Sequence, residues 1–232
     1  MSKFKKRKDV LVLIPAYNEA DTIEELIVRA KKYCDVCVIN DASTDKTEKI
    51  VKSMRAVKCI SHKKNTHIPQ AILDGMKYAL SKKYKYIITM DAGLSHNPDE
   101  LKNFIAFKKC DLLLSYRIKT KAVPLYRKFL SKAGTILYNV TLNPFFLENR
   151  PYLIDFTSGY RRYSKKAVRY LLSKNMKARS FDFHTESASY IYRNKNLSIL
   201  QTPISYNYSN SSLNMRVLTD SIRMLLIIAL SK

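Results

Sequence analysis

Three short apolar runs in this chain each end in a cluster of polar side chains. The runs at residues 10–14, 36–39 and 86–90 are followed by the sequences PAYNE, NDASTD and DAG, at positions 15–19, 40–45 and 91–93. Carboxylate, amide and hydroxyl oxygens suit a ligand with many hydrogen-bond donors, or a hard metal ion. In an open α/β sheet, ligands bind outside the carboxyl ends of the strands. If the three runs are strands of one such sheet, their polar ends form a single crevice.

The elements that must position these clusters alternate along the first half of the chain. We expect strands at residues 10–14, 36–39, 57–60, 86–90 and 111–115, with helices at 20–33, 45–54, 69–81 and 98–107 between them. Strands separated by helical patterns of this length predict βαβ units and a parallel sheet. In the second half we expect helices at 124–142, 165–172, 182–193 and 213–230, and extended segments at 160–163 and 197–204.

Composition sets limits on the class of protein. The 232 residues, 46% of them hydrophobic, can form one large domain. The net charge of +23 favours nucleic acid, an anionic membrane surface or phosphate-bearing substrates. A nucleic-acid-binding module is therefore an alternative, although no RNP, KH or zinc-finger signature is present and acidic strand ends would repel phosphates.

Cysteine usage and hydropathy indicate the compartment. Cys34 and Cys37 have the C-x-x-C spacing of zinc and redox sites, but no second pair is present, so we expect reduced thiols and a cytoplasmic protein. No run of about 20 apolar residues is present, so we expect no transmembrane helix.

The turn after the first run excludes two classes of enzyme. A dinucleotide-binding domain needs G-x-G-x-x-G at this place, and a P-loop needs its own glycine-rich loop before a lysine. Residues 15–19 contain no glycine, so a dehydrogenase and a P-loop enzyme are both excluded.

The polar clusters together resemble family 2 glycosyltransferases of the GT-A fold, and most of all dolichol-phosphate mannose synthase and related polyprenyl-phosphate glycosyltransferases. The resemblance continues through SYR at 115–117, SGYR at 158–161 and Glu186, and covers nearly the whole chain. It implies an α/β fold with a mostly parallel central sheet flanked by helices. We expect a basic N-terminal arm at 1–9, a GT-A domain at 10–212 and an amphipathic helix at 213–232. Within the domain, residues 10–115 would bind the nucleotide sugar and 116–212 the acceptor.

The resemblance also assigns residues to the nucleotide-sugar donor. Here Tyr17 would stack on a base or ribose, while Glu19 and Asp41 would accept hydrogen bonds from that base or ribose. The full set of residues implied for nucleotide-sugar binding is Pro15, Tyr17, Glu19, Asp41, Asp91 and Arg161. Arg161 would contact the diphosphate. The alternative for Glu19 and Asp45 is that they only cap helices.

Asp91 matches the first aspartate of the Asp-x-Asp pattern that holds Mg²⁺ or Mn²⁺ in this family. Gly93 stands where the second aspartate belongs, so we expect weaker metal binding that depends on the donor's diphosphate. His96 is a second candidate ligand, or else a loop histidine that faces solvent. A catalytically impaired relative is the alternative that Gly93 raises.

The acceptor is expected to be a phosphate. A phosphate monoester has a second pKa near ~6, so at neutral pH it is already an anionic nucleophile and needs arginines that hold it. The resemblance places these contacts at Arg117, Arg127 and Ser131. A saccharide or other hydroxyl acceptor would instead need a carboxylate base. Candidates for that base are Glu186, Asp182 and Asp155, although Glu186 could equally fix neighbouring arginines.

We therefore expect an inverting glycosyltransferase that moves a sugar from a nucleotide-diphosphate sugar to a polyprenyl or dolichyl phosphate, with Asp91, Arg117 and Glu186 as catalytic residues. The same donor chemistry with a hydroxyl acceptor, in cell-surface glycan synthesis, is the alternative. The apolar face of the helix at 213–230 and the basic N-terminus predict peripheral attachment to the cytoplasmic face of a membrane. The alternative explanations of that apolar face are burial in the core of the protein and dimerisation.

Overall fold

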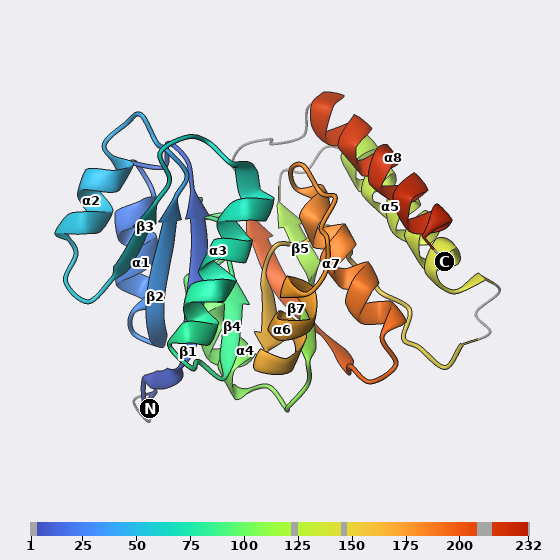
Figure 1. Cartoon of the computed structure of the whole chain (residues 1–232), viewed down its shortest axis with the longest axis horizontal. Coiled ribbons are helices and arrows are strands. Elements are labelled where there is room, and N and C mark those ends of the chain that lie inside the picture. Colours follow the sequence, from blue (N-terminus) through green and yellow to red (C-terminus); the bar gives the residue numbers. More distant parts are fainter. Residues whose placement is uncertain (1–3, 122–124, 145–147, 208–214, 232) are drawn as a thin grey trace.

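A computed structural model describes residues 4–121, 125–144, 148–207 and 215–231 of the chain. Its centre is one seven-stranded sheet with the strand order β3-β2-β1-β4-β6-β5-β7 (Figure 1). The strands are β1 (Arg7–Ala16), β2 (Cys34–Asn40), β3 (Lys58–Ser61), β4 (Tyr86–Thr89), β5 (Leu112–Lys121), β6 (Arg161–Ser164) and β7 (Ile199–Asn207).

All but one of these strands run in the same direction. The pairs β1–β2, β2–β3, β1–β4 and β5–β7 are parallel, whereas β6 is antiparallel to both of its neighbours, β4 and β5. The carboxyl ends of the parallel strands therefore lie at one edge of the sheet, and β6 begins at that same edge.

Helices cover both faces of the sheet (Figure 1). One face packs against α1 (Ile23–Ala30), α2 (Thr47–Ser53) and α4 (Leu101–Ala106), which follows a short 3-10 turn, η1 (Pro98–Glu100). The other face packs against α3 (His67–Ser81), α6 (Lys165–Leu172) and α7 (Asp182–Arg193). Two further helices, α5 (Leu125–Leu142) and α8 (Met215–Leu230), lie side by side against α7, and the hydroxyl of Tyr138 donates to the carbonyl of Ser221 between them, at 2.8 Å.

The apolar run of β1 explains why both faces are covered. Val10, Val12 and Ile14 point into the α1 side of the core, and Leu11 and Leu13 point into the α3 side. Successive side chains of a strand point to opposite faces, so a wholly apolar strand needs a layer on each.

The expected elements are present, and the α/β fold with a mostly parallel sheet is confirmed. Most of the bounds differ by a few residues from those expected; the strands β1 and β5 are longer, since β1 begins at Arg7 and β5 continues to Lys121. Long-range contacts set these differences, since Arg7 pairs with Cys34 and Lys121 with Asn207. The limits 1–9, 10–212 and 213–232 stay predictions.

The cysteines and the helices also bear on the sequence-based expectations. All four thiols are free, and burial raises the pKa of Cys34 and of Cys37 to about 12, so both are protonated at neutral pH. In the described part of the chain, no helix has the length and apolar character needed to cross a membrane.

Candidate functional site

The site begins where the strand order reverses. From β1 the chain builds β2 and β3 on one side, and then crosses to place β4 on the other side of β1. A crevice opens at such a switch point, outside the carboxyl ends of the two strands. Glu19 follows β1 and Asp91 follows β4, so the fold brings these two carboxylates to that place.

Short contacts confirm that Glu19 and Asp91 are neighbours. The hydroxyl of Thr22 lies 3.1 Å from Glu19 Oε2 and 3.2 Å from the carbonyl oxygen of Ala92. Burial raises the pKa of Glu19, and the negative charge of Asp91 raises it further. A β-carbon placed at Gly93 would lie 4.0 Å from Glu19 Oε2, so this glycine leaves the space between the two loops open.

The start of β6 brings a second segment to Asp91. Because β6 runs antiparallel to β4, Arg161 pairs with Thr89, and Gly159 lies beside the end of β4. The Thr89 hydroxyl donates to the Gly159 carbonyl at 2.7 Å. A β-carbon at Gly159 would lie only 2.8 Å from Asp91 Oδ1 and 3.0 Å from His184 Nε2, so any larger residue would displace one of these groups.

Two buried imidazoles complete this end of the site. His184 is 2% exposed, and neither of its ring nitrogens has a hydrogen-bond partner among the described residues. Nδ1 of the buried His96 lies 3.5 Å from Asp91 Oδ2, which is too long for a good hydrogen bond, so we count this nitrogen as unpaired as well. Burial lowers the pKa of both histidines, so both rings are neutral at pH 7 and each keeps one nitrogen lone pair.

These groups offer a partial coordination sphere for a divalent cation. Asp91 supplies a half-exposed carboxylate, but the described residues contain no group of three His, Cys, Asp or Glu side chains that could hold a metal ion. Mg²⁺ is often bound by one or two carboxylates, with substrate phosphates and waters completing the shell. The residues present fit a cation that arrives with a diphosphate, and not one held by the protein alone.

Asp41 has partners of its own. Its Oδ1 accepts hydrogen bonds from the Thr66 backbone N–H and from the Thr66 hydroxyl, both at 2.8 Å, and lies 2.7 Å from His62 Nδ1. Burial by itself raises the pKa of Asp41, but these hydrogen bonds outweigh it and hold that pKa below its usual value. Asp41, which directly follows β2, therefore also holds the connection between β3 and α3 in place.

Asp41 and Asp91 lie in separate clusters at one edge of the sheet. In the described structure no hydrogen bond or ion pair joins Asp41 to Asp91, and β1 lies between β2 and β4. Neighbouring strands are about 4.8 Å apart, so the ends of β2 and β4 are separated by roughly 10 Å. Tyr17 follows β1 between them with 48% of its surface exposed, while Pro15 is half-buried at the end of that strand. A ligand that touches both clusters must be long and extended.

Arg117 is engaged with another protein group. It makes a bidentate ion pair with Asp155, with Nε–Oδ2 at 2.7 Å and Nη2–Oδ1 at 3.0 Å, and it also donates to Thr157. Asp155 in turn accepts from the backbone N–H groups of Thr157 and Ser158, so the pair fixes the loop that leads to Gly159. The structure thus gives Arg117 a positioning role beside the site.

Two expected site residues lie in buried, fully hydrogen-bonded positions. Arg161 is 0% exposed, and its guanidinium donates to the carbonyl oxygens of Phe156, Ser158 and His184. This placement argues against its contact with a diphosphate, because no surface of the side chain reaches the crevice. The carboxylate of Glu186 accepts the backbone N–H groups of Lys177 at 2.7 Å and of Ala178 at 2.8 Å, which leaves it holding a loop instead of facing a substrate.

The remaining acceptor residues lie on α5. Ser131 is half-buried there, and no hydrogen bond or ion pair joins it to Arg117 among the described side chains. Arg127 lies within α5, but its side chain is outside the described part of the chain. The role of both in acceptor binding stays a prediction.

Sequence reasoning missed His184, Gly159, His62 and Thr66 as members of these clusters. The SGYR segment at 158–161 drew attention to the arginine, whereas the structure uses the glycine. No local signal marks His184, since it lies within a helix and only the packing of α7 against β6 directs it to Asp91.

Comparison with known proteins agrees with this geometry. The model of glycosyl transferase family 2 matches residues 11–169. The UDP-N-acetylglucosamine–dolichyl-phosphate N-acetylglucosaminyltransferase of Methanococcus voltae is 26% identical over 231 residues, covering 89% of this chain and 88% of that protein. The undecaprenyl-phosphate mannosyltransferase of Micrococcus luteus is 26% identical over 211 residues, covering 85% of this chain and 83% of that protein.

A solved structure shows the same fold. The structure of GalNAc-T7 with UDP, GalNAc and Mn²⁺ matches 94% of this chain and 47% of that one, with a TM-score of 0.52 and 13% identity. The family match spans well over half of the chain, and the crevice between β1 and β4 carries the residues by which the sequence resembles that family. The chain belongs to glycosyl transferase family 2 and is a glycosyltransferase of the GT-A fold.

Proposed function

We propose that this glycosyltransferase moves a sugar from a nucleotide-diphosphate sugar to a polyprenyl phosphate, with inversion at the anomeric carbon. The observation that carries the proposal is the convergence of Glu19, Asp91 and two unpaired imidazoles at the switch point of the sheet. The names of the two relatives, which both contain a polyprenyl-type phosphate, support the acceptor class.

The donor would lie along the carboxyl edge of β2, β1 and β4. Tyr17 would stack on the base or ribose, and Asp41 and Glu19 would accept hydrogen bonds from it. A hydrogen bond to a charged acceptor contributes about 1.5–3 kcal/mol, so two of them can select one base. The roughly 10 Å between the ends of β2 and β4 suits a nucleoside at one end and its diphosphate at the other.

The transfer replaces one carbon–oxygen bond with another. An oxygen of the acceptor phosphate attacks the anomeric carbon from the face opposite the nucleotide diphosphate, whose bond to that carbon breaks. A phosphate monoester is already ionised at neutral pH, so this step needs no general base. The engagement of Glu186 and Asp155 with other protein groups supports an acceptor of this kind over a hydroxyl group.

A divalent cation, Mg²⁺ or Mn²⁺, would neutralise the charge that develops on the leaving diphosphate. Asp91 would be its carboxylate ligand, and the unpaired ring nitrogens of His96 and His184 would accept hydrogen bonds from waters bound to the ion. Arg117, fixed by Asp155, would add positive potential beside Asp91.

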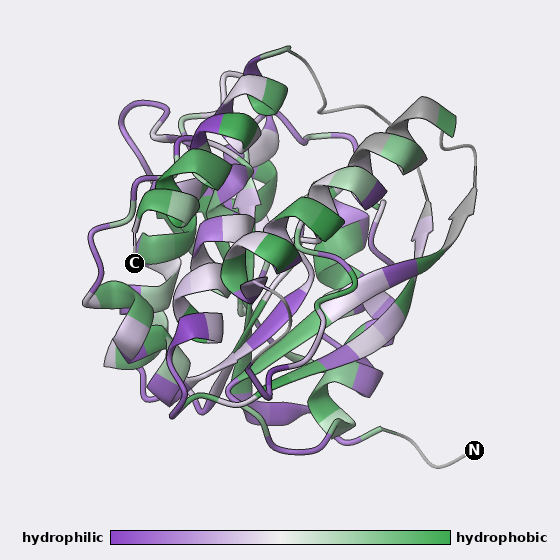
Figure 2. Cartoon of the chain, turned by 90° about the vertical axis from the view of Figure 1, so that its right-hand side faces the viewer, coloured by the Kyte–Doolittle hydropathy of each residue, from purple (hydrophilic) through white to green (hydrophobic). Residues whose placement is uncertain are grey.

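We further propose that the enzyme attaches peripherally to the cytoplasmic face of a membrane through α5 and α8. The outer surfaces of this helix pair expose large apolar side chains, and Figure 2 shows the two helices side by side with apolar segments along both. The most exposed of these side chains are Leu125, Phe129, Met215, Ile222, Leu226 and Leu230. A helix with one apolar face and basic residues beside it binds at an anionic interface, and four free thiols suit a reducing compartment.

Thermal stability in the presence of nucleotide sugars tests the donor site. We expect one member of a panel of UDP-, GDP- and dTDP-sugars to raise the melting temperature, with a larger shift when Mn²⁺ is present. Asp91→Asn should abolish the Mn²⁺-dependent part of the shift. Asp9→Asn, which removes an exposed carboxylate at the other end of β1, should leave it unchanged.

Transfer of labelled sugar from that donor then tests the acceptor. Labelled polyprenyl phosphate should form, and polyprenol without phosphate should not react. No stabilisation by any nucleotide sugar would contradict the donor site, and transfer to polyprenol or to a saccharide alone would contradict the phosphate acceptor.

A further inference from the structure

The ring of His96 lies between two tyrosine rings that belong to different parts of the sheet. Tyr160 directly precedes β6, and its ring centroid is 5.3 Å from that of His96. Tyr206 lies near the end of β7, in a T-shaped arrangement with His96 at 5.5 Å. Tyr160 is in turn stacked on Phe104 of α4, with the ring centroids 4.3 Å apart. Because Tyr160 is 0% exposed and Tyr206 is half-buried, this row of rings begins in the core and ends at Tyr206.

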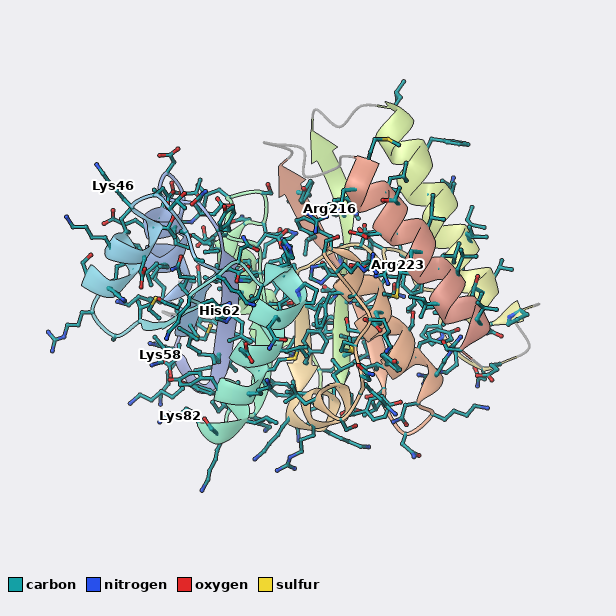
Figure 3. The ribbon with its side chains drawn as sticks, turned by 45° about the horizontal axis from the view of Figure 1, so that its top comes forward. Lys46, Lys58, His62, Lys82, Arg216 and Arg223 are labelled. Atoms are coloured by element: carbon teal, nitrogen blue, oxygen red, sulfur yellow. The ribbon has the colours of Figure 1, made fainter. Side chains whose placement is uncertain are left out.

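The backbone of Tyr206 also joins two parts of the sheet. On one side it pairs with Thr120 of β5, and on the other it forms an antiparallel bridge with His96, in the loop after β4. Figure 3 shows the ends of β5 and β7 side by side at the edge of the sheet that comes forward. The loop that carries Asp91 and His96 is therefore attached to β7, although β6 and β5 lie between β4 and β7.

The same tyrosine ring contacts Arg117. The guanidinium carbon of Arg117 lies 5.2 Å from the ring centroid of Tyr206, a distance typical of a cation–π contact. Ile118 is the extra residue of a β-bulge, since the pairing of β5 with β7 changes register between Arg117 and Lys119. Bulges redirect side chains and are frequent beside active sites. The ion pair with Asp155 and the ring of Tyr206 are two separate contacts that fix the guanidinium group.

His96 and Arg117 both lie beside Asp91. Nδ1 of His96 is 3.5 Å from Asp91 Oδ2, and Arg117 is close enough to Asp91 for their charges to interact. In the proposed transfer, negative charge develops on the diphosphate that leaves at this place, so preorganised groups here act on the transition state. A displacement of about 1 Å in such groups can lower a rate about 100-fold.

We propose that Tyr206 is a positioning residue for the transfer, and that its ring holds the His96 ring and the Arg117 guanidinium in place beside Asp91. The proposal rests on the proposed function, in that it takes Asp91 to be the end of the site where the diphosphate leaves. Tyr206 acts by packing and takes no part in the chemistry. The ring at this position therefore matters, and the hydroxyl does not.

NMR signals of the histidine rings test the contact without any ligand. The chain has four histidines, so their ring C–H signals give a simple spectrum, and His96→Gln identifies the signal of His96. We expect Tyr206→Leu to shift this signal, because it removes an aromatic ring 5.5 Å away, and Tyr206→Phe to preserve it. His62 and His67, which lie between β3 and the first turn of α3, should keep their signals in every variant of Tyr206.

Steady-state transfer of labelled sugar to polyprenyl phosphate tests the consequence. We expect Tyr206→Leu to lower kcat by about tenfold or more and to change the KM for the nucleotide sugar by less than about threefold, because the loss falls on the transition state. Tyr206→Phe keeps a ring face for the guanidinium and should stay within about twofold of wild type. Tyr206→Met, with an unbranched apolar side chain, replaces Tyr206→Leu if that variant does not fold. Tyr170→Leu removes another half-buried tyrosine with a cation–π contact, to Lys174, and should keep the wild-type kcat.

The outcomes separate this proposal from the function on which it rests. Unchanged His96 signals in Tyr206→Leu, or a wild-type kcat in a variant without the ring, would overturn the positioning role and leave the function standing. Equal losses of kcat in Tyr206→Phe and Tyr206→Leu would assign the effect to the hydroxyl, and would also overturn it. If wild-type protein transferred no sugar to polyprenyl phosphate, the proposed function would be wrong, and the histidine spectra would still decide whether Tyr206 holds His96.

Discussion

At the scale of single residues, the site depends on one place where a side chain would not fit. Gly159 separates Asp91 from His184, and a β-carbon there would press on Asp91 Oδ1 at 2.8 Å. The described glycines have no positive φ, so an alanine at this position meets this contact but no backbone strain. Asp91 is half-exposed and free to rotate away, whereas His184 is buried. The carboxylate would therefore be the group that moves.

We expect Gly159→Ala to weaken binding of the nucleotide sugar at least about tenfold and to change the melting temperature little. Isothermal titration and thermal unfolding of the same preparation measure both. Gly134→Ala, where a β-carbon meets no atom within 4 Å, is the control and should bind like wild type. Undiminished donor binding by Gly159→Ala would show that the position of Asp91 is not critical.

Asp41 gives a prediction with a definite pH dependence. Its pKa in the folded protein lies below the unfolded value of about 3.9. Its stabilising effect is therefore fully present above that value and is lost as the pH falls through the folded-state pKa. We expect Asp41→Asn to lower the free energy of unfolding by about 1–3 kcal/mol at pH 7, because the Thr66 N–H loses a charged acceptor.

Urea unfolding of wild type and Asp41→Asn between pH 7 and pH 3 tests this. The difference between the two proteins should shrink toward the acidic end. Asp21→Asn, at an exposed carboxylate without a side-chain hydrogen bond in the described structure, should show no such difference. A gap between wild type and Asp41→Asn that stayed constant over this range would contradict the role of the ionised carboxylate.

At the scale of elements, two helices carry an interior glycine for different reasons. Gly75 lets α3 lie close to the sheet, since a β-carbon there would be 2.9 Å from Ile39 Cδ1 and 3.0 Å from Leu13 Cδ1. Gly134 in α5 has open space around it. Alanine is favoured over glycine by about 1 kcal/mol in a helix, but overpacking a core costs about 1–3 kcal/mol.

The same substitution should therefore act in opposite directions. We expect Gly75→Ala to lower the free energy of unfolding by about 1–2 kcal/mol, and Gly134→Ala to raise it by about 0.5–1 kcal/mol. Chemical denaturation of the two variants beside wild type measures both changes. If Gly75→Ala were stabilising, the close contact between α3 and the sheet would be wrong.

At the scale of the whole molecule, the apolar outer surface of α5 and α8 should determine where the enzyme resides. We expect the protein to sediment with vesicles that contain anionic lipid, and more weakly as salt is added, because screening reduces the contribution of basic residues. Leu226→Glu should reduce the bound fraction several-fold. Val28→Glu, at a similarly exposed apolar position on α1, is the matched control and should bind like wild type.

Equal vesicle binding by Leu226→Glu and wild type would leave α5 and α8 without a membrane role. In that case sedimentation equilibrium would test whether the same surface joins two copies of the chain.

The sequence by itself determined the order of strands and helices, the parallel half of the sheet and the chemistry of the loops after β1, β2 and β4. These features are local, because periodicity and turn residues report on segments of 5 to 15 residues. The sequence also predicted that these loops lie at one edge of the sheet, since parallel strands with short connections end there together, but it did not predict that Asp41 and Asp91 lie in separate clusters.

Only the tertiary structure decided which of the polar groups face a ligand. Arg161 and Glu186 look like site residues in the sequence, but their hydrogen bonds go to backbone groups of α7 and of the neighbouring loops. His184 carries no sequence signal, and the antiparallel strand β6 and the packing of α7 bring it to Asp91. A charged residue looks the same in the sequence whether its side chain binds a substrate or another group of the protein. Its partner is fixed by how loops and helices pack in the folded chain, which no local pattern records.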